Sequence, residues 1–368
     1  MKILYVTTVA ETMRFFPEHI KMLQEEGNVV ELATNCRKQY NESVKDLRCK
    51  TYHIPFSRKV CSWENIKSYS KLKKLIKREK YDVVHTHTPN ASVIVRIACK
   101  GLRKNGMKVL YTAHGFHFYK GAPVRNWIFF FPVEWVCAFW TDVLITINME
   151  DYALAKRCIK AKRIEYIPGV GIDLEKFQTM EDEREIVRKE LGMKQEDVML
   201  FSAGELNHNK NHETVIRILN KIKDKRLHYF IAGQGPLFDY LKGLIEKLKL
   251  QKQVHLLGYR NDIFRLYQGA DIYVLPSIRE GLNVSLMEAM ASGLPVICSR
   301  IRGNMDLVSH QKGGFLCNVN SESEIIEAMK ALSDKRLRRK MGKFNINKIK
   351  KFEMGIIKSK LKNTYDSI

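Results

Sequence analysis

The sequence has no apolar run long enough to cross a bilayer, which takes ~20 residues in a helix. Its most membrane-like stretch, Trp127 to Trp140 (WIFFFPVEWVCAFW), is shorter and contains Pro132 and Glu134. We therefore predict no transmembrane helix. The apolar run after Met1-Lys2 is too short for a signal peptide, and we expect it to form the first strand of the fold.

Paired cysteines are also missing. The eight cysteines are scattered, without C-x-x-C pairs or clusters with histidine. This argues against a zinc site or a disulfide framework and favours a reducing, cytoplasmic compartment. The sequence has no acidic cluster of the D-x-D type either. We expect no divalent metal and no other cofactor.

Negative charge is scarce: 40 acidic residues face 63 lysines and arginines, for a formal net charge of +23. Such an excess implies an anionic partner, which is nucleic acid, an anionic membrane face or a phosphorylated substrate. Two segments concentrate the charge. Arg58 to Lys80 holds nine basic residues against two acids, and Lys335 to Lys351 holds nine against none.

The chain is too long for one ordinary core, so we expect two domains. Strand-like and helix-like segments alternate along its length, which predicts α/β domains with parallel sheets and helices on both faces. A glycine-rich break at 167–173 and a charged stretch at 180–191 mark the boundary. We predict a first domain at 1–168, a linker or hinge at 169–195, a second domain at 196–350 and a terminal segment at 351–368.

The stretch from Asp271 to Val296, DIYVLPSIREGLNVSLMEAMASGLPV, is the most informative part of the chain. It predicts a buried strand, a turn at Pro276-Ser277 and a helix that begins near Leu282 or Asn283. Such a unit binds ligands at the carboxyl edge of a parallel sheet. The helix N-terminus favours phosphate, and the carboxylates of Glu280 and Glu288 suit sugar and ribose hydroxyls.

Glu280, seven intervening residues, Glu288 and the tail EAMASGLPV resemble the E-x7-E signature of retaining GT-B glycosyltransferases of family 4 (group 1). The resemblance covers nearly the whole chain. It implies two Rossmann-like domains facing across a cleft, with the terminal segment crossing back to the first domain as a helix. Taken together, the sequence motifs are most similar to those of bacterial enzymes that extend lipid-linked glycans with N-acetylgalactosamine or a similar sugar.

The resemblance assigns donor-binding roles in the second domain. Glu280 is expected to hold the donor sugar hydroxyls, and Glu288 the ribose. The remaining donor residues at this helix start are Gly281, Leu282 and Asn283. The segment FSAGELNHNKNH resembles the family segment G-R-L-x-x-x-K-N-H. There Gly204 permits a sharp turn, and Lys210 is assigned to the donor diphosphate and to catalysis with Glu280.

Glu205 departs from the pattern, because the family has a phosphate-binding arginine at this position. The missing charge would come from Arg300, Arg302 or helix N-terminal amides. Arg300 and Arg302 are equally consistent with surface charges that support their loop.

Two further turns lie where the family holds the nucleotide. Gly233 and Gly235 follow a strand in AGQGP, and Tyr259-Arg260 follows the next strand. Tyr259 is expected to pack on the base, with the backbone nearby reading it. A purely structural turn remains the alternative at both places.

Histidines follow two strands of the first domain. In YTAHGFHFYKG, His114 stands where the family has a histidine near the reacting sugar. We assign it to the catalytic group and place His117 and Lys120 on the acceptor side. His87 is also placed there, although it and His85 are equally consistent with structural residues. The sequence has no third potential ligand spaced near His85 and His87, so it does not support a metal site there.

We therefore expect a metal-independent, retaining glycosyltransferase that uses a UDP-sugar and a polyprenyl-diphosphate saccharide in capsule, exopolysaccharide or glycan biosynthesis. The basic charge and the aromatic stretch favour peripheral attachment to the inner face of the cell membrane. Two alternatives remain open. One is a GT-B-type sugar-nucleotide epimerase without an acceptor, and the other is a basic nucleic-acid-binding protein, for which no binding motif is found.

Overall fold

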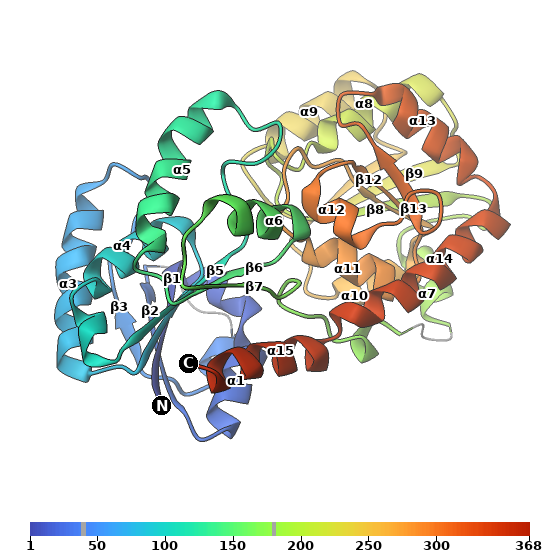
Figure 1. Cartoon of the computed structure of the whole chain (residues 1–368). Helices are drawn as coiled ribbons and strands as arrows, with labels where there is room; N and C mark the ends of the chain where they lie inside the picture. Colours follow the sequence, from blue (N-terminus) through green and yellow to red (C-terminus); the bar gives the residue numbers. More distant parts are fainter. Residues whose placement is uncertain (38–41, 179–181) are drawn as a thin grey trace. The chain divides into compact units, whose positions relative to one another are not determined.

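The computed structural model describes residues 1–37, 42–178 and 182–368, and it divides into two compact units. Unit 1 comprises Met1–Gly171 together with Gly355–Ile368, and unit 2 comprises Ile172–Met354. Each unit has its own parallel sheet with helices on both faces (Figure 1). The predicted α/β class with two Rossmann-like domains is confirmed. Residues 172–178 and 182–195, which we predicted as a linker, are grouped with unit 2.

The sheet of unit 1 has seven parallel strands in the order β3-β2-β1-β4-β5-β6-β7. Its buried strands are rich in apolar and β-branched residues, as expected where both faces are covered. Thr51–His53 and Arg163–Tyr166, which we did not predict, are the two edge strands. The strands are β1 (Lys2–Val9), β2 (Val29–Asn35), β3 (Thr51–His53), β4 (Val83–Thr86), β5 (Lys108–Ala113), β6 (Val143–Thr146) and β7 (Arg163–Tyr166).

Apolar side chains of α3 and α4 pack on one face of this sheet and form its main core. Figure 1 shows α1 and α15 on the other face. Lys358 and Lys362 of α15 form ion pairs with Glu18 and Glu26 beside α1. The helices are α1 (Pro17–Glu25), α2 (Glu42–Lys45), α3 (Trp63–Glu79), α4 (Pro89–Cys99), α5 (Val124–Ala138), α6 (Met149–Cys158) and α15 (Met354–Asp366).

The aromatic stretch of unit 1 forms α5, which has one buried and one exposed face. Trp127 and Phe131 pack against the buried Phe118. Glu134 is buried and forms a bidentate ion pair with Arg96 of α4, at 2.8 and 3.0 Å. Ile128 is 62% exposed on the opposite side. Along the described residues, every helix is too short or too polar to cross a membrane.

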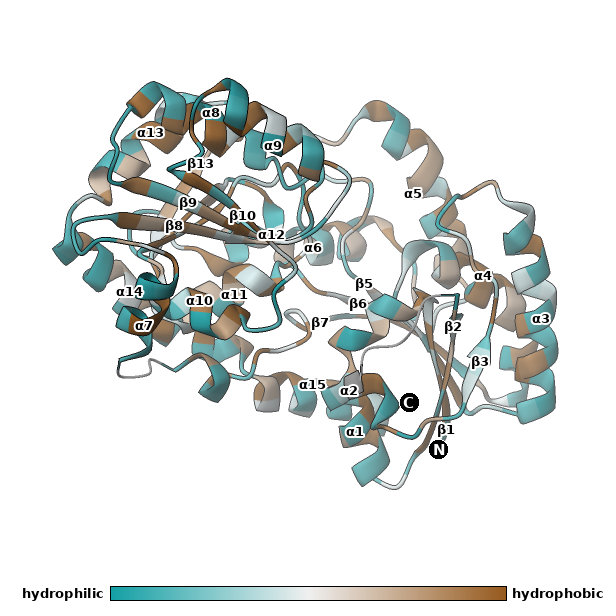
Figure 2. Ribbon diagram, turned by 180° about the vertical axis from the view of Figure 1, so that it is seen from behind, coloured by the Kyte–Doolittle hydropathy of each residue, from teal (hydrophilic) through white to brown (hydrophobic). Residues whose placement is uncertain are grey.

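The sheet of unit 2 has six parallel strands in the order β10-β9-β8-β11-β12-β13. Its strands are hydrophobic, and the outer faces of its helices are hydrophilic (Figure 2). The helices α8, α9 and α13 pack on one face, and α10 and α11 lie on the other (Figures 1 and 2). The strands are β8 (Val198–Ala203), β9 (Leu227–Ala232), β10 (Val254–Gly258), β11 (Ile272–Leu275), β12 (Val296–Ser299) and β13 (Gly314–Cys317). The helices are α7 (Glu183–Glu190), α8 (His212–Ile222), α9 (Phe238–Lys247), α10 (Ile263–Gly269), α11 (Val284–Ala291), α12 (Arg302–Leu307), α13 (Glu322–Ala331) and α14 (Lys335–Ile349).

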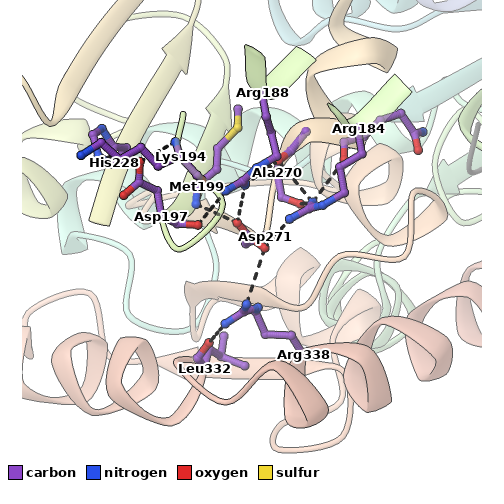
Figure 3. Close-up of polar contacts among 12 residues, drawn as sticks. Arg184, Arg188, Lys194, Asp197, Met199, His228, Ala270, Asp271, Leu332 and Arg338 are labelled. Carbon is purple, nitrogen blue, oxygen red and sulfur yellow. Dashed lines mark hydrogen bonds and ion pairs between the residues drawn. The ribbon is translucent and has the colours of Figure 1, made fainter. Parts of the chain in front are cut away.

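Asp271 anchors the amino end of β11, the strand that leads to the E-x7-E loop. Its carboxylate accepts hydrogen bonds from Arg184 at 2.7 Å and Arg188 at 2.9 Å, both on α7, and lies 3.6 Å from Arg338 of α14 (Figure 3). It also accepts a bond from the backbone N–H of Met199 at 2.9 Å. Charged groups therefore attach α7 to unit 2, which explains why α7 has few apolar residues.

Candidate functional site

The E-x7-E segment folds as a strand, a loop and a helix, as predicted. The helix α11 begins at Val284, because Asn283 is its N-cap and accepts a hydrogen bond from the Leu286 N–H at 2.9 Å. The Ser285 hydroxyl donates to the same Asn283 oxygen at 2.7 Å. The Asn283 side-chain oxygen thus already caps the helix, and its contact with a donor stays a prediction.

Glu280 and Lys210 lie together although 70 positions separate them. The Lys210 Nζ is 2.7 Å from Glu280 Oε1, and the two side chains are only 15% and 12% exposed. Gly204 supports the lysine stem, because a Cβ there would lie 3.1 Å from Lys210 Cε. Unit 2 therefore brings the predicted phosphate-binding cation and the predicted sugar-binding carboxylate into direct contact.

Backbone and amide hydrogen bonds join the loop at 207–211 to the loop at 276–280. The Asn209 carbonyl accepts from the Ile278 N–H at 2.8 Å. The Asn209 side chain accepts from the Arg279 N–H at 3.1 Å and donates to its carbonyl at 2.9 Å. Asn211 donates to the Pro276 carbonyl at 3.3 Å. These bonds fix the spacing of the two loops that carry Lys210 and Glu280.

Glu288 lies on α11 and accepts a hydrogen bond from the Tyr267 hydroxyl at 2.9 Å. Tyr267 is fully buried, and burial followed by the nearby Glu288 charge raises its pKa well above the ordinary value. The phenol therefore keeps its hydrogen, which is shared between this carboxylate and the Ser285 carbonyl, 3.0 Å from the hydroxyl. Sequence reasoning missed Tyr267, because nothing in the linear sequence marks a tyrosine on α10 as a partner of a glutamate on α11.

The glycines after β8 and β9 are required for backbone packing. A Cβ on Gly233 would lie 1.8 Å from the Gly204 carbonyl oxygen, and one on Gly235 would lie 2.5 Å from that of Leu206. The structural turn that we kept as an alternative therefore accounts for both glycines. Their contact with a nucleotide stays a prediction.

Tyr259 and Arg260 follow β10 at the surface. Tyr259 is 64% exposed, whereas the Arg260 guanidinium donates to both carboxylate oxygens of Asp262, at 2.7 and 2.5 Å. A donor that uses the Arg260 side chain must compete with this ion pair. Tyr259 presents its ring to solvent, as a base-stacking residue requires.

The two arginines proposed to replace the family arginine have structural contacts. Arg302 is buried, and its Nε donates to the Glu280 carbonyl at 3.2 Å. Arg300 donates to the Leu316 carbonyl at 2.8 Å. Glu205 is exposed and accepts a hydrogen bond from the Asn207 amide at 2.9 Å. Arg302 thus supports the backbone that carries Glu280.

Unit 1 gathers histidines at the carboxyl ends of β4 and β5. His114 Nε2 lies 3.4 Å from His87 Nδ1, and both rings line a cavity of about 10 Å³, the size of a single water. His85 bonds to the Tyr365 hydroxyl at 2.7 Å and to Thr112 at 2.8 Å. His85 is therefore a satisfied core residue, as its structural alternative required.

Burial lowers the pKa of every histidine in this cluster. The pKa of His114 falls to about 4, as does that of His19, which we did not predict and which bonds to the Val170 carbonyl at 2.8 Å. Burial lowers the pKa of His85 and His87 further. All four imidazoles are neutral at pH 7, so they offer polar contacts without charge.

The other two acceptor-side candidates lie apart from this cavity. The His117 ring stacks on Phe130 of α5, with centroids 4.6 Å apart. Lys120 is exposed, and its backbone N–H donates to Glu150 at 3.1 Å. Across residues 1–37, 42–178 and 182–368, no group of three or more His, Cys, Asp or Glu side chains is arranged to hold a metal ion.

Known proteins are similar to this chain in sequence and in fold. Residues 183–348 match the family described as glycosyl transferases group 1, and residues 2–148 match glycosyl transferase 4-like proteins. EpsD of Bacillus subtilis, which is named as a glycosyltransferase, is 36% identical over 93% of this chain and 90% of its own length. The UDP-Gal:α-D-GlcNAc-diphosphoundecaprenol α-1,3-galactosyltransferase of Escherichia coli is 33% identical over 82% of this chain and 79% of its own. The structure of HepE from Anabaena in complex with UDP and glucose superposes with a TM-score of 0.84 at 19% identity, over 100% of both chains.

Proposed function

Because the chain belongs to the group 1 family of glycosyltransferases, we propose that it transfers a hexose or N-acetylhexosamine from a UDP-sugar to a saccharide carried on polyprenyl diphosphate, with retention at the anomeric carbon. The observation that carries this proposal is the ion pair between Lys210 and Glu280 beside the start of α11. A cation and a carboxylate at the carboxyl edge of a parallel sheet suit a diphosphate and its attached sugar.

In the proposed reaction, cleavage of the anomeric C–O bond leaves negative charge on the UDP diphosphate. Lys210 exchanges Glu280 for this diphosphate and stabilises the charge as it develops. The released Glu280 carboxylate accepts hydrogen bonds from donor sugar hydroxyls, and Glu288 accepts them from the ribose. The acceptor hydroxyl attacks the same face of the sugar, and the departing phosphate takes its proton.

The proposed acceptor follows from relatives and charge. The E. coli relative is named for transfer to a GlcNAc-diphosphoundecaprenol, and it aligns over most of both chains. A diphosphate acceptor also suits a protein with a formal charge of +23. We place the enzyme in the biosynthesis of a capsule, exopolysaccharide or related glycan, on the cytoplasmic side of the membrane.

A surface of unit 1 supports peripheral membrane attachment. We define the α5 face as Val124, Ile128 and Phe129, which are 73%, 62% and 69% exposed. At the end of the neighbouring α4, Lys100 lies over the Trp140 ring, 4.7 Å from its centroid. The basic helix α3 lies beside α4 on the same side of the sheet (Figures 1 and 2). Exposed apolar side chains and basic helices in the same unit suit an anionic lipid surface, with ~1 kcal/mol for each basic residue near it.

A donor panel tests the reaction. Purified enzyme is incubated with UDP-glucose, UDP-galactose and their N-acetylated forms, with and without GlcNAc-diphosphoundecaprenol. We expect one donor to give a lipid-linked disaccharide with an α linkage, as measured by mass spectrometry and NMR. Inversion of the anomeric centre would contradict the retaining mechanism. A new sugar nucleotide formed from donor alone would identify an epimerase instead.

Vesicle binding tests membrane attachment. We expect Phe129→Glu to reduce sedimentation with phosphatidylglycerol vesicles, because a charge on the α5 face opposes insertion. Ile186→Glu is the matched control, since Ile186 is 46% exposed on α7 of unit 2. Equal binding by both variants, or binding that high salt leaves unchanged, would exclude this surface and its basic neighbours as the docking site.

A further inference from the structure

His212 begins a chain of buried hydrogen bonds behind the Lys210 loop. It is the first residue of α8, and its Nδ1 lies 2.9 Å from the Tyr229 hydroxyl of β9. That hydroxyl lies 2.8 Å from the Ser202 hydroxyl of β8, which donates to the Val274 carbonyl of β11 at 2.5 Å. His212 is 2% exposed, and Tyr229 and Ser202 are fully buried. The chain thus connects the start of α8 to three strands of the sheet.

The direction of every bond in this chain is determined. Ser202 has one hydroxyl hydrogen, and it is given to the Val274 carbonyl. Ser202 must then accept from Tyr229, so the only phenol hydrogen is also used. Tyr229 must therefore accept from His212, which requires a hydrogen on Nδ1. His212 is a donor at Nδ1, and its buried Nε2 has no hydrogen-bond partner among the described residues.

The charge state of His212 agrees with this direction. Burial, with a smaller contribution from Lys210, lowers its pKa to about 3. The imidazole is therefore neutral at physiological pH and carries a single ring hydrogen.

The backbone turn at Asn211 separates the side chains of Lys210 and His212, which point in different directions. The φ of 53° at Asn211 is left-handed, a conformation that asparagine tolerates better than most residues. On one side of this turn, Lys210 reaches Glu280. On the other side, His212 enters the core and bonds to Tyr229. The position of Lys210 thus depends on how His212 is held.

We propose that His212, Tyr229 and Ser202 form a positioning relay that fixes the Lys210 loop relative to the E-x7-E loop. The inference rests on the proposed function, because it assigns the donor diphosphate to Lys210. The sheet supplies the fixed end at Val274, which lies in the same strand as the Glu280 loop. The positions of both loops are then fixed by the same strand, β11. Lys210 is held where it can exchange Glu280 for phosphate.

The direction of the relay gives a sharp test with two substitutions of one residue. The side-chain amide of asparagine places an N–H close to the His212 Nδ1, whereas glutamine places its N–H close to Nε2. We expect His212→Gln and the nearly isosteric Tyr229→Phe to weaken UDP binding about tenfold and to raise KM for the UDP-sugar. His212→Asn should stay within about twofold of the wild type. UDP affinity is measured by calorimetry on protein whose fold is checked by circular dichroism.

His255→Asn is the matched control, because this histidine lies on β10 of the same sheet and stacks on Phe230 at 4.4 Å. It should lower the melting temperature without changing UDP affinity. A His212→Asn variant as weak as His212→Gln would overturn the relay, and so would a Tyr229→Phe variant with wild-type affinity. Wild-type protein that fails to bind any nucleoside diphosphate would instead reject the proposed function itself.

The double variant His212→Gln/Tyr229→Phe provides an independent check. If the residues act as one relay, the double variant should bind UDP no more weakly than the worse single variant. Fully multiplied losses would show two independent structural effects and contradict the proposal.

Discussion

Lys210 and Glu280 form a direct ion pair, with 2.7 Å between Nζ and Oε1. In the proposed reaction each group also holds the other in place until the donor arrives. Removing either group therefore leaves the other without its ion-pair partner.

Lys210→Ala should lower kcat at least about a hundredfold, because it removes the cation that stabilises the departing diphosphate. It also leaves Glu280 without its partner, so KM for the donor should change too. Steady-state kinetics at saturating acceptor measures both constants. Lys242→Ala, on the exposed part of α9, is the control and should leave both unchanged. Full activity in Lys210→Ala would remove the lysine from the reaction.

Glu288→Ala should weaken donor binding about tenfold or more, because the ribose loses an ionised acceptor. Tyr267→Phe removes the phenol that fixes this carboxylate at 2.9 Å and should produce a smaller effect in the same direction. Isothermal calorimetry with UDP and with free UMP separates ribose contacts from diphosphate contacts. The ribose role is wrong if Glu288→Ala binds UMP as tightly as the wild type does.

Asp271→Ala should destabilise unit 2 by about 3–5 kcal/mol, because it leaves Arg188 and Arg338 largely buried without their carboxylate. Chemical denaturation followed by circular dichroism measures the change, because all four tryptophans lie in unit 1. Asp224→Ala removes an exposed ion pair with Arg226 and should cost at most about 1 kcal/mol. Similar losses in the two variants would show that the three-arginine cluster contributes no more than an ordinary surface pair.

Stability should fall in mild acid because of the histidine cluster in unit 1. His19 and His114 bind protons near pH 6.5 when unfolded but only near pH 4 in the folded protein, because burial lowers their pKa values. Between these pH values the unfolded chain holds more protons. Stability is therefore complete above about pH 6.5 and decreases as the pH falls toward 4, by at most roughly 3 kcal/mol for one such histidine.

Urea unfolding at pH 7.5 and pH 5 measures this effect. His19→Gln removes one titrating group and should reduce the difference between the two pH values, whereas substitution of the exposed His208 should not. A stability that stays constant from pH 7.5 to 5 would contradict the buried, neutral state of the cluster.

Activity should be independent of divalent metal, because Lys210 supplies the positive charge at the diphosphate. The enzyme is assayed after dialysis against EDTA and again after addition of Mg²⁺ or Mn²⁺. Equal rates are expected. Activity that is lost with EDTA and restored by Mg²⁺ would contradict the proposed role of Lys210 as the sole cation.

The local pattern of the sequence was sufficient for the fold class and for the E-x7-E unit. Buried strands such as Ile272–Leu275 are short apolar runs, and the amphipathic helix at 63–79 shows its period directly. The strands β3, β7 and β13 were not predicted; β3 and β7 are edge strands whose residues are partly exposed and carry no apolar run. Edge strands form because a neighbouring strand offers hydrogen bonds, and that neighbour is remote in the chain.

The sequence by itself therefore determined the two α/β halves, the strand, loop and helix around Glu280 and Glu288, and the candidacy of Lys210. Only the tertiary structure decided which side chains meet. In that structure Lys210 forms an ion pair with Glu280, and the Tyr267 hydroxyl donates to Glu288. Arg302 donates to the Glu280 carbonyl, and a hydrogen bond to Tyr229 connects His212 to the sheet. The physical reason is that periodicity follows from contacts along one element, whereas hydrogen bonds and ion pairs between elements depend on the packing that brings distant segments together.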